Sequence, residues 1–188
     1  MHRLKIETQP MHHALESHAR MKALMSDDLT HAEYTHLLRR LYGFYAPLET
    51  RLAAWDAETV AINPQQRRKT AWLAQDLQAL SPDALTSALP RCNSLPAVDG
   101  VAAALGCWYV LEGATLGGQI ICRHLRQQLG LGAETGLRFY TGYGHHTGMQ
   151  WRTFQAAADD IMVGHSDAEA IRSARSTFKS LETWLNCE

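Results

Sequence analysis

Several features that would place this chain in a specialised class are missing from its sequence. No run of 18 or more apolar residues occurs, so no segment is expected to span a bilayer. The first residues are polar and basic, and we expect no signal peptide there. A net charge of −1 provides no overall attraction to nucleic acid or to an anionic membrane. We therefore expect a cytoplasmic protein that binds neither nucleic acid nor membrane.

The four cysteines are Cys92, Cys107, Cys122 and Cys187, and they form neither a C-x-x-C pair nor a zinc-binding spacing. We interpret them as reduced thiols, with Cys107 and Cys122 buried and unreactive because no basic cluster flanks them. Catalytic Ser-His-Asp spacings, phosphate-binding loops and dinucleotide fingerprints are also missing. Ten histidines are a high number for 188 residues, and they direct the search for function towards iron or another metal.

Alternating strand patterns are absent too, and nearly every segment has an apolar repeat of helical period. We predict one all-α domain of seven or eight helices spanning residues 1–188. The basic clusters, residues 39–40 and 67–69, are expected on solvated helix faces. A long helix is expected from about Asp99 to Leu129, and a structured loop over residues 139–148.

Helix starts are marked by residues that cap the first turn. The first helix is predicted to begin near Thr8, with Pro10 in its first turn. Thr30 and Glu33 have the spacing of a capping box. A short helix is expected after residues 81–83, and Asp167 is expected to cap the last helix.

The most unusual stretch covers residues 107–121, with the sequence CWYVLEGATLGGQII. It is apolar and helical in period, yet it contains Gly113, Gly117 and Gly118. Each glycine inside a helix costs about 0.5–1 kcal/mol relative to alanine, so the backbone here is expected to be closely approached. Two explanations fit: a helix packs on Gly113 and Gly117, or a flat ligand lies against the bare backbone. The stretch by itself favours helix packing.

His12 and His13 are adjacent on the first predicted helix and point about 100° apart. His12 lies at the edge of the apolar stripe, whereas His13 is expected to face water. An imidazole at that edge could bind a metal, and Glu16, one turn further on, could accept its other N–H and fix the tautomer. The alternative is a histidine that only packs at a helix boundary.

Two other histidine patterns carry less weight. Glu33 and His36 have the E-x-x-H spacing of half a di-iron site, but the chain has no second copy, so an exposed helix face is the simpler interpretation. His145 and His146 are adjacent in a glycine-rich segment, which is weak support for a metal site.

Two motifs taken together resemble the heme oxygenase family. Residues 4–12, LKIETQPMH, resemble its first helix, in which a Thr-x-x-x-His spacing supplies the proximal heme ligand. Residues 109–119, YVLEGATLGGQ, are similar to its distal helix, in the form found in the bacterial branch that accompanies phytochromes. Residues 177–185, TFKSLETWL, also fit the last helix of the family. The resemblance covers essentially the whole domain.

The resemblance implies that heme lies between the first helix and the glycine-bearing helix. His12 would bind the heme iron as its metal ligand, with Glu16 supporting it. Gly113, Gly117 and Gly118 would let the distal backbone approach the porphyrin and steer iron-bound dioxygen towards one meso carbon.

The family opens the heme ring with dioxygen and gives biliverdin, ferrous iron and carbon monoxide. Heme would therefore be both substrate and cofactor, and electrons would come from an external donor such as ferredoxin, a flavin reductase or ascorbate. A bacterial phytochrome is the implied recipient of biliverdin. By position, Lys5 and Arg152 match basic residues that hold the heme propionates in the family.

One position departs from the family pattern. Many members carry an aspartate directly after the first distal glycine, where it anchors the water network that protonates bound dioxygen, and this chain has Ala114. Tyr45 matches a tyrosine of that network, and Thr115 or Gln119 are candidates to replace the aspartate. A heme-binding or heme-sequestering protein without turnover is therefore an alternative. A heme-free relative, such as a di-iron oxidase or a thiamin-degrading enzyme, is a third interpretation.

Overall fold

The computed structural model describes residues 1–81 and 89–187, and every regular element in these ranges is helical. The predicted all-α class is therefore confirmed, whereas the short helix expected after residues 81–83 lies outside the described residues. The longer elements are α1 (His2–Glu16), α2 (Ala19–Ala23), α3 (His31–Leu52), α4 (Pro64–Arg67), α5 (Thr70–Leu80), α6 (Val101–Leu129), α7 (Arg138–Thr141), α8 (Thr147–Ile161) and α9 (Asp167–Asn186). Single 3₁₀ turns are η1 (Ala53–Trp55), η2 (Val60–Ile62), η4 (Ala133–Thr135) and η5 (Gly144–His146).

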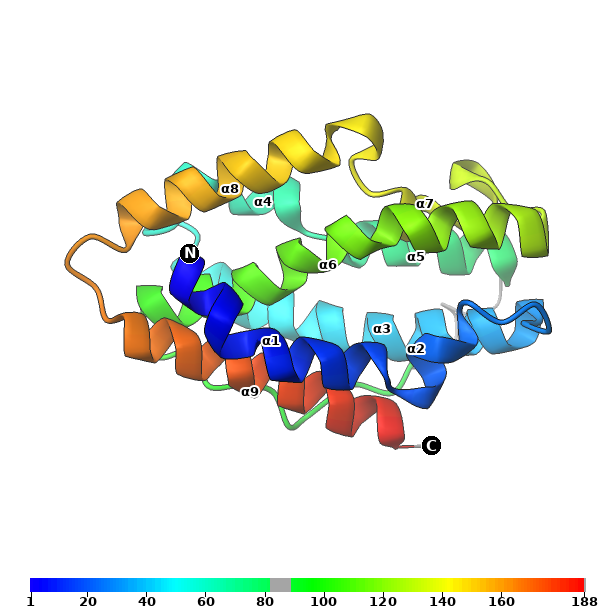
Figure 1. Ribbon diagram of the computed structural model, residues 1–188, viewed down its shortest axis with the longest axis horizontal. Helices are drawn as coiled ribbons and strands as arrows, with labels where there is room; N and C mark the ends of the chain where they lie inside the picture. Colours follow the sequence, from blue (N-terminus) through cyan, green and yellow to red (C-terminus); the bar gives the residue numbers. More distant parts are fainter. Residues whose placement is uncertain (82–88, 188) are drawn as a thin grey trace.

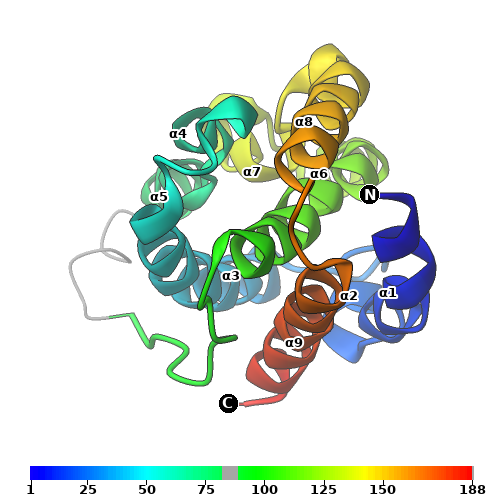
Figure 2. The ribbon, with the colours of Figure 1, turned by 90° about the vertical axis from the view of Figure 1, so that its left-hand side faces the viewer.

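Helix α6 runs through the middle of the molecule, and the other helices surround it (Figure 1, Figure 2). It packs against α9, α7 and α8, while α3 packs against α5. Helix α1 lies at the outside and packs mainly along α9. Helix α1 is therefore connected to the rest of the molecule mainly through α9.

The crossing of α6 and α9 is close because Gly106 has no side chain. A Cβ atom there would collide with the backbone carbonyl of Ala170. Trp108 and Leu111, further along α6, are fully buried and fill the space between the helices. This contact fixes the first half of α6, and the second half carries the glycine-rich motif.

The first helix begins at His2, so the prediction of a start near Thr8 is wrong. Pro10 consequently lies inside the helix, where it removes one backbone hydrogen bond. Leu4 is buried, and packing of this first turn on the core offsets that loss.

Other predicted boundaries agree with the structure. Thr30 and Glu33 form the capping box: the Thr30 Oγ1 accepts from the Glu33 N–H at 3.2 Å, and the Thr30 N–H donates to Glu33 Oε2 at 2.9 Å. Helix α6 ends at Leu129, where Gly130 is left-handed with φ of 66°. The last helix is capped by Ser166 rather than by Asp167, which is its first residue.

The segment predicted as a loop, residues 139–148, is instead mostly helical turns, because it includes the end of α7, η5 and the start of α8. No helix in the described part of the chain combines the length and the apolar content that crossing a bilayer requires.

Candidate functional site

His12 lies on α1 with its imidazole half exposed. Its Nδ1 atom is 3.4 Å from Glu16 Oε2, one turn further along the helix. The ring also contacts Phe178 of α9 edge-on, with 6.2 Å between ring centroids. Among the described residues Nε2 has no hydrogen-bond partner, so its lone pair is available when the proton sits on Nδ1. The two side chains are close together, as their spacing predicts, and the role of the pair at a metal stays a prediction.

His13 is also exposed, so exposure alone does not separate the two histidines. The difference lies in their neighbours. Thr8, one turn before His12, is buried, and Phe178 touches the His12 ring. His13 contacts only the edge of His12 among the aromatic rings of the described chain. His12 therefore borders the core, as expected.

The three glycines of α6 have different surroundings. A Cβ at Gly117 would meet no described atom within 4 Å, and one at Gly113 would lie 3.6 Å from the Trp151 ring. Gly118 is buried, and a Cβ there would lie 3.1 Å from the backbone carbonyl of Tyr140 in α7. Helix packing therefore accounts for Gly118. At Gly113 the near neighbour is the Trp151 side chain of α8, and at Gly117 no described atom lies within 4 Å, so helix packing accounts in part for Gly113 and not for Gly117.

An apolar surface continues from the open glycines. Leu116 and Ile120 stand one and two turns along the same side of α6 and are 43% and 66% exposed. We call Gly113, Leu116, Gly117 and Ile120 the glycine face. Large exposed apolar side chains beside bare backbone are typical of a surface that a flat apolar ligand covers.

The glycine face and His12 are brought together by a contact between their helices. Burial raises the pKa of Tyr109, and a hydrogen bond with the Thr8 side chain counteracts part of that rise. Thr8 lies one turn before His12 on α1, and Tyr109 lies one turn before Gly113 on α6. From this contact the two helices run in the same general direction and diverge (Figure 1). The contact of Thr8 with Tyr109 thus places the helix that carries His12 beside the helix that carries the glycine face.

Lys5 and Arg152 are exposed, and neither has an ion-pair partner among the described residues. Lys5 stands two turns before His12, so both lie on one side of α1. Arg152 follows Trp151, the residue that Gly113 faces. Lys5 is therefore on the helix of His12, and Arg152 is on α8, the helix whose Trp151 packs against Gly113.

Tyr45 is buried in α3 and packs edge-on against Phe139, with ring centroids 5.4 Å apart. Burial raises its pKa well above the usual range, and the carboxylates of Glu49 and Glu112 raise it further. The hydroxyl is therefore held in its protonated form, as a hydrogen-bond donor.

The candidate replacements for the missing aspartate are engaged elsewhere. Thr115 Oγ1 donates to the Glu112 carbonyl at 2.7 Å, within its own helix. Gln119 Nε2 donates to the Thr141 carbonyl at 3.1 Å. Ala114 itself is exposed and has no polar side-chain atom. Since none of these three residues is acidic, no carboxylate at these positions replaces the missing aspartate.

Sequence reasoning missed a buried ionic cluster behind α6. Residues 67–69 were expected on a solvated face, but Arg67 is 4% and Lys69 1% exposed. Both pair with Glu112, which is fully buried. A lone carboxylate in the apolar run of α6 was the available signal, since a buried charge requires partners of opposite sign.

The other histidine patterns gain no support. Glu33 is occupied in the capping box, and no group of three or more potential metal ligands occurs within the described ranges. His145 and His146 in η5 contact each other with tilted rings, whose centroids are 3.8 Å apart.

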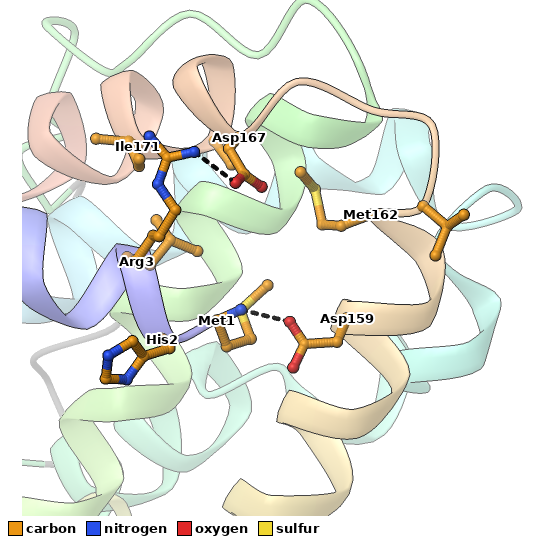
Figure 3. Close-up of a pocket in the computed structure, with 10 residues that line it drawn as sticks. Met1, His2, Arg3, Asp159, Met162, Asp167 and Ile171 are labelled. Atoms are coloured by element: carbon orange, nitrogen blue, oxygen red, sulfur yellow. Dashed lines mark hydrogen bonds and ion pairs between the residues drawn. The ribbon is translucent and has the colours of Figure 1, made fainter.

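A separate cavity of about 310 Å³ lies where the first turn of α1 meets the end of α8 and the start of α9 (Figure 3). An ion pair between Arg3 and Asp167, at 2.8 Å, crosses its edge, and Met162 and Ile171 contribute apolar walls. None of the predicted site residues lines this cavity.

Comparison with known proteins gives concordant matches. The family model described as "Heme oxygenase" matches residues 1–187. A curated heme oxygenase of Xanthomonas campestris pv. campestris (strain 8004) is 30% identical over 172 residues, which cover 89% of this chain and 98% of that protein.

Two solved structures share the fold. The heme oxygenase of Leptospira interrogans superposes with a TM-score of 0.76 at 19% identity, over 96% of this chain and 95% of its own. Heme oxygenase-1 of the cyanobacterium Synechocystis sp. PCC6803, solved in complex with heme, gives 0.75 at 17% identity, over 98% of this chain and 89% of its own.

Proposed function

Because this chain belongs to the heme oxygenase family, we propose that it opens the heme ring with dioxygen and external electrons and releases biliverdin, ferrous iron and carbon monoxide. Because the chain is a member of the heme oxygenase family, it is an enzyme of heme degradation. The observation that carries the finer proposal is the contact of Thr8 in α1 with Tyr109 in α6, which brings the helix of His12 beside the helix of the glycine face.

The residues of α1 suit the proximal side. His12 would bind the iron through Nε2, while Glu16 holds the proton on Nδ1 and orients the ring. Phe178, behind the imidazole, limits its rotation. A neutral, oriented imidazole is the form that binds iron, so the pair prepares His12 for that role.

The residues of α6 suit the distal side. Gly117 lets the backbone come close to a flat ligand, and Leu116 and Ile120 would lose exposed apolar area on contact with it. Burial of such area stabilises binding by about 25 cal/mol per Å². Lys5 and Arg152 are assigned to the propionates, because both are exposed cations without an ion-pair partner among the described residues. Gly118 supports the face from behind through its contact with α7.

Bound heme supplies the iron at which dioxygen reacts and the ring that is opened. The chain contributes binding, orientation and exclusion of water on both faces of the ring. Tyr45 remains protonated and able to donate a hydrogen bond, and we assign it to the polar network behind the distal helix.

We assign the electrons to an external donor, either ferredoxin, a flavin reductase or ascorbate, and biliverdin to a bacterial phytochrome as its recipient. A cytoplasmic location fits both partners. These assignments rest on the resemblance of residues 109–119 to the phytochrome-associated branch.

Ala114 supports one competing function, a heme-binding protein without turnover. A titration with hemin followed by ascorbate under air separates the two. We expect a hemin complex whose absorption is replaced by that of biliverdin, with release of carbon monoxide. A stable hemin spectrum would establish the binding protein instead, and absence of hemin binding would contradict both.

A further inference from the structure

Glu112 is fully buried and directly precedes Gly113 in the glycine face. Its Oε1 accepts from Arg67 Nη1 at 2.5 Å, and its Oε2 accepts from Lys69 Nζ at 2.6 Å. The Tyr143 hydroxyl donates to the same Oε2 at 3.1 Å. Both carboxylate oxygens are therefore held by charged or polar donors from segments outside α6.

The partners of Glu112 are themselves held in place. Lys69 Nζ also donates to the Arg67 carbonyl at 2.5 Å, and the Lys69 N–H donates to Glu49 Oε1 at 2.6 Å. Glu49 Oε2 accepts from the Thr70 hydroxyl at 2.6 Å, so this α3 carboxylate caps the start of α5. Arg67 Nη1 reaches the Gln150 carbonyl of α8 at 3.3 Å. The cluster thus connects α6 to α3, α5 and α8.

The charges in the cluster balance, since two carboxylates face two cations. Burial lowers the pKa of Lys69, and the adjacent Glu112 carboxylate counteracts that effect. Buried ion pairs of this kind add little net stability compared with apolar packing, but they tolerate only one geometry. The cluster is therefore better suited to fixing a position than to stabilising the fold.

The segment of α6 that follows Glu112 depends on such a fixed contact for its orientation. Three glycines within six residues make this part of α6 pliable, and Gly117 has no described neighbour to hold it. Two of the contacts that hold this part of α6 are the Glu112 cluster and the contact of Gly118 with Tyr140. A small rotation of α6 would shift the glycine face relative to His12.

We propose that Glu112 is the positioning residue of the distal helix: its bonds to Arg67, Lys69 and Tyr143 set the rotation of the glycine face and thereby the edge of the heme that is opened. The inference rests on the proposed function, since it concerns how heme is held. Glu112 itself lies on the buried side of α6 and acts through Gly113 and Gly117.

Glu112→Gln tests the proposal, with Glu49→Gln as the matched control. Both changes remove one buried negative charge from the same cluster, but only the first is on α6. We expect both variants to lose thermal stability. Only Glu112→Gln should weaken hemin binding, about tenfold, shift the Soret band and convert a single biliverdin isomer into a mixture. Hemin affinity and the Soret band report on heme position without turnover.

Tyr143→Phe provides a gentler variant in case Glu112→Gln does not fold. It removes one donor to Glu112 without altering any charge, and we expect a smaller change in isomer ratio in the same direction. Unchanged isomer ratio and hemin affinity in Glu112→Gln, or in Tyr143→Phe if Glu112→Gln does not fold, would overturn the proposal. Equal changes in Glu49→Gln would also overturn it, by showing a general structural role. Absence of hemin binding by the unaltered protein would instead contradict the proposed function.

Discussion

His12 Nδ1 lies 3.4 Å from the Glu16 carboxylate, one turn further along α1. Both side chains are more than half exposed, at 56% and 62%, so the pair contributes little to stability. We propose that the pair serves to orient the imidazole, because a carboxylate that accepts from Nδ1 would leave Nε2 free to bind iron. This relationship was predicted from the i, i+4 spacing alone.

The first prediction follows from that pair. Glu16→Ala should weaken hemin binding by about tenfold, because the imidazole loses its fixed tautomer and orientation. The change should leave the melting temperature nearly unaltered. Competition for hemin with a reference protein measures the affinity. Glu7→Ala is the matched control, since Glu7 is on the same helix but pairs with Arg175. An equal loss in the control would contradict the assigned role of Glu16.

The second prediction separates the glycines of α6 by their surroundings. Gly117→Ala should stabilise the heme-free protein by about 0.5–1 kcal/mol, because the helix gains propensity and the new Cβ meets no described atom. Gly106→Ala should destabilise it by about 1–3 kcal/mol, because the Cβ collides with the Ala170 carbonyl. Thermal unfolding of both variants checks the contrast.

Gly117→Leu extends this test to the ligand. The heme-free variant should fold, since the space is open, but it should lose hemin binding or change the biliverdin isomer. Wild-type affinity and an unchanged isomer would show that no ligand approaches the backbone at Gly117.

The third prediction concerns pH. Burial raises the pKa of Asp76 to about 6, even though its two oxygens accept from the N–H groups of Arg138 and Phe139 at 2.6 and 2.8 Å. The folded state therefore binds the proton more tightly than the unfolded chain, whose value is near 3.8. Stability from this carboxyl is greatest below pH 3.8 and falls as pH rises through 6, by about 3 kcal/mol.

Asp76→Asn should remove this contribution to the pH dependence. Denaturant unfolding at pH 4 and pH 7 gives the change in unfolding free energy for each protein. We expect the wild type to lose more stability than the variant between the two values. Identical pH dependence would mean that the carboxyl titrates normally in the folded protein.

The helical architecture could be predicted because its signals are local. The capping box of Thr30 and Glu33 and the end of α6 at Gly130 depend only on nearby residues, and both agree with the structure. The pairing of His12 with Glu16 is local as well. The start of α1 was misplaced because the burial of Leu4, which no local pattern reports, sustains a helix through Pro10.

Contacts between distant segments could not be predicted. Arg67 and Lys69 look like surface cations in sequence, since their partner Glu112 lies 45 and 43 residues away. Gly118 was grouped with Gly117, and only the position of Tyr140 in α7 separates their roles. Short sequence motifs were therefore enough to predict the site residues on α1 and α6. The ionic cluster around Glu112 could not be predicted, because its members come together only in the fold.

The most direct test of the account compares His12→Ala with His13→Ala in a hemin titration followed by absorption. Both side chains are exposed and adjacent, so the two changes disturb the fold to a similar, small extent. We predict that His12→Ala abolishes the native hemin spectrum and that added imidazole restores it, while His13→Ala retains that spectrum. Equal losses in the two variants, or a native spectrum in His12→Ala without imidazole, would contradict the assignment of His12 as the iron ligand.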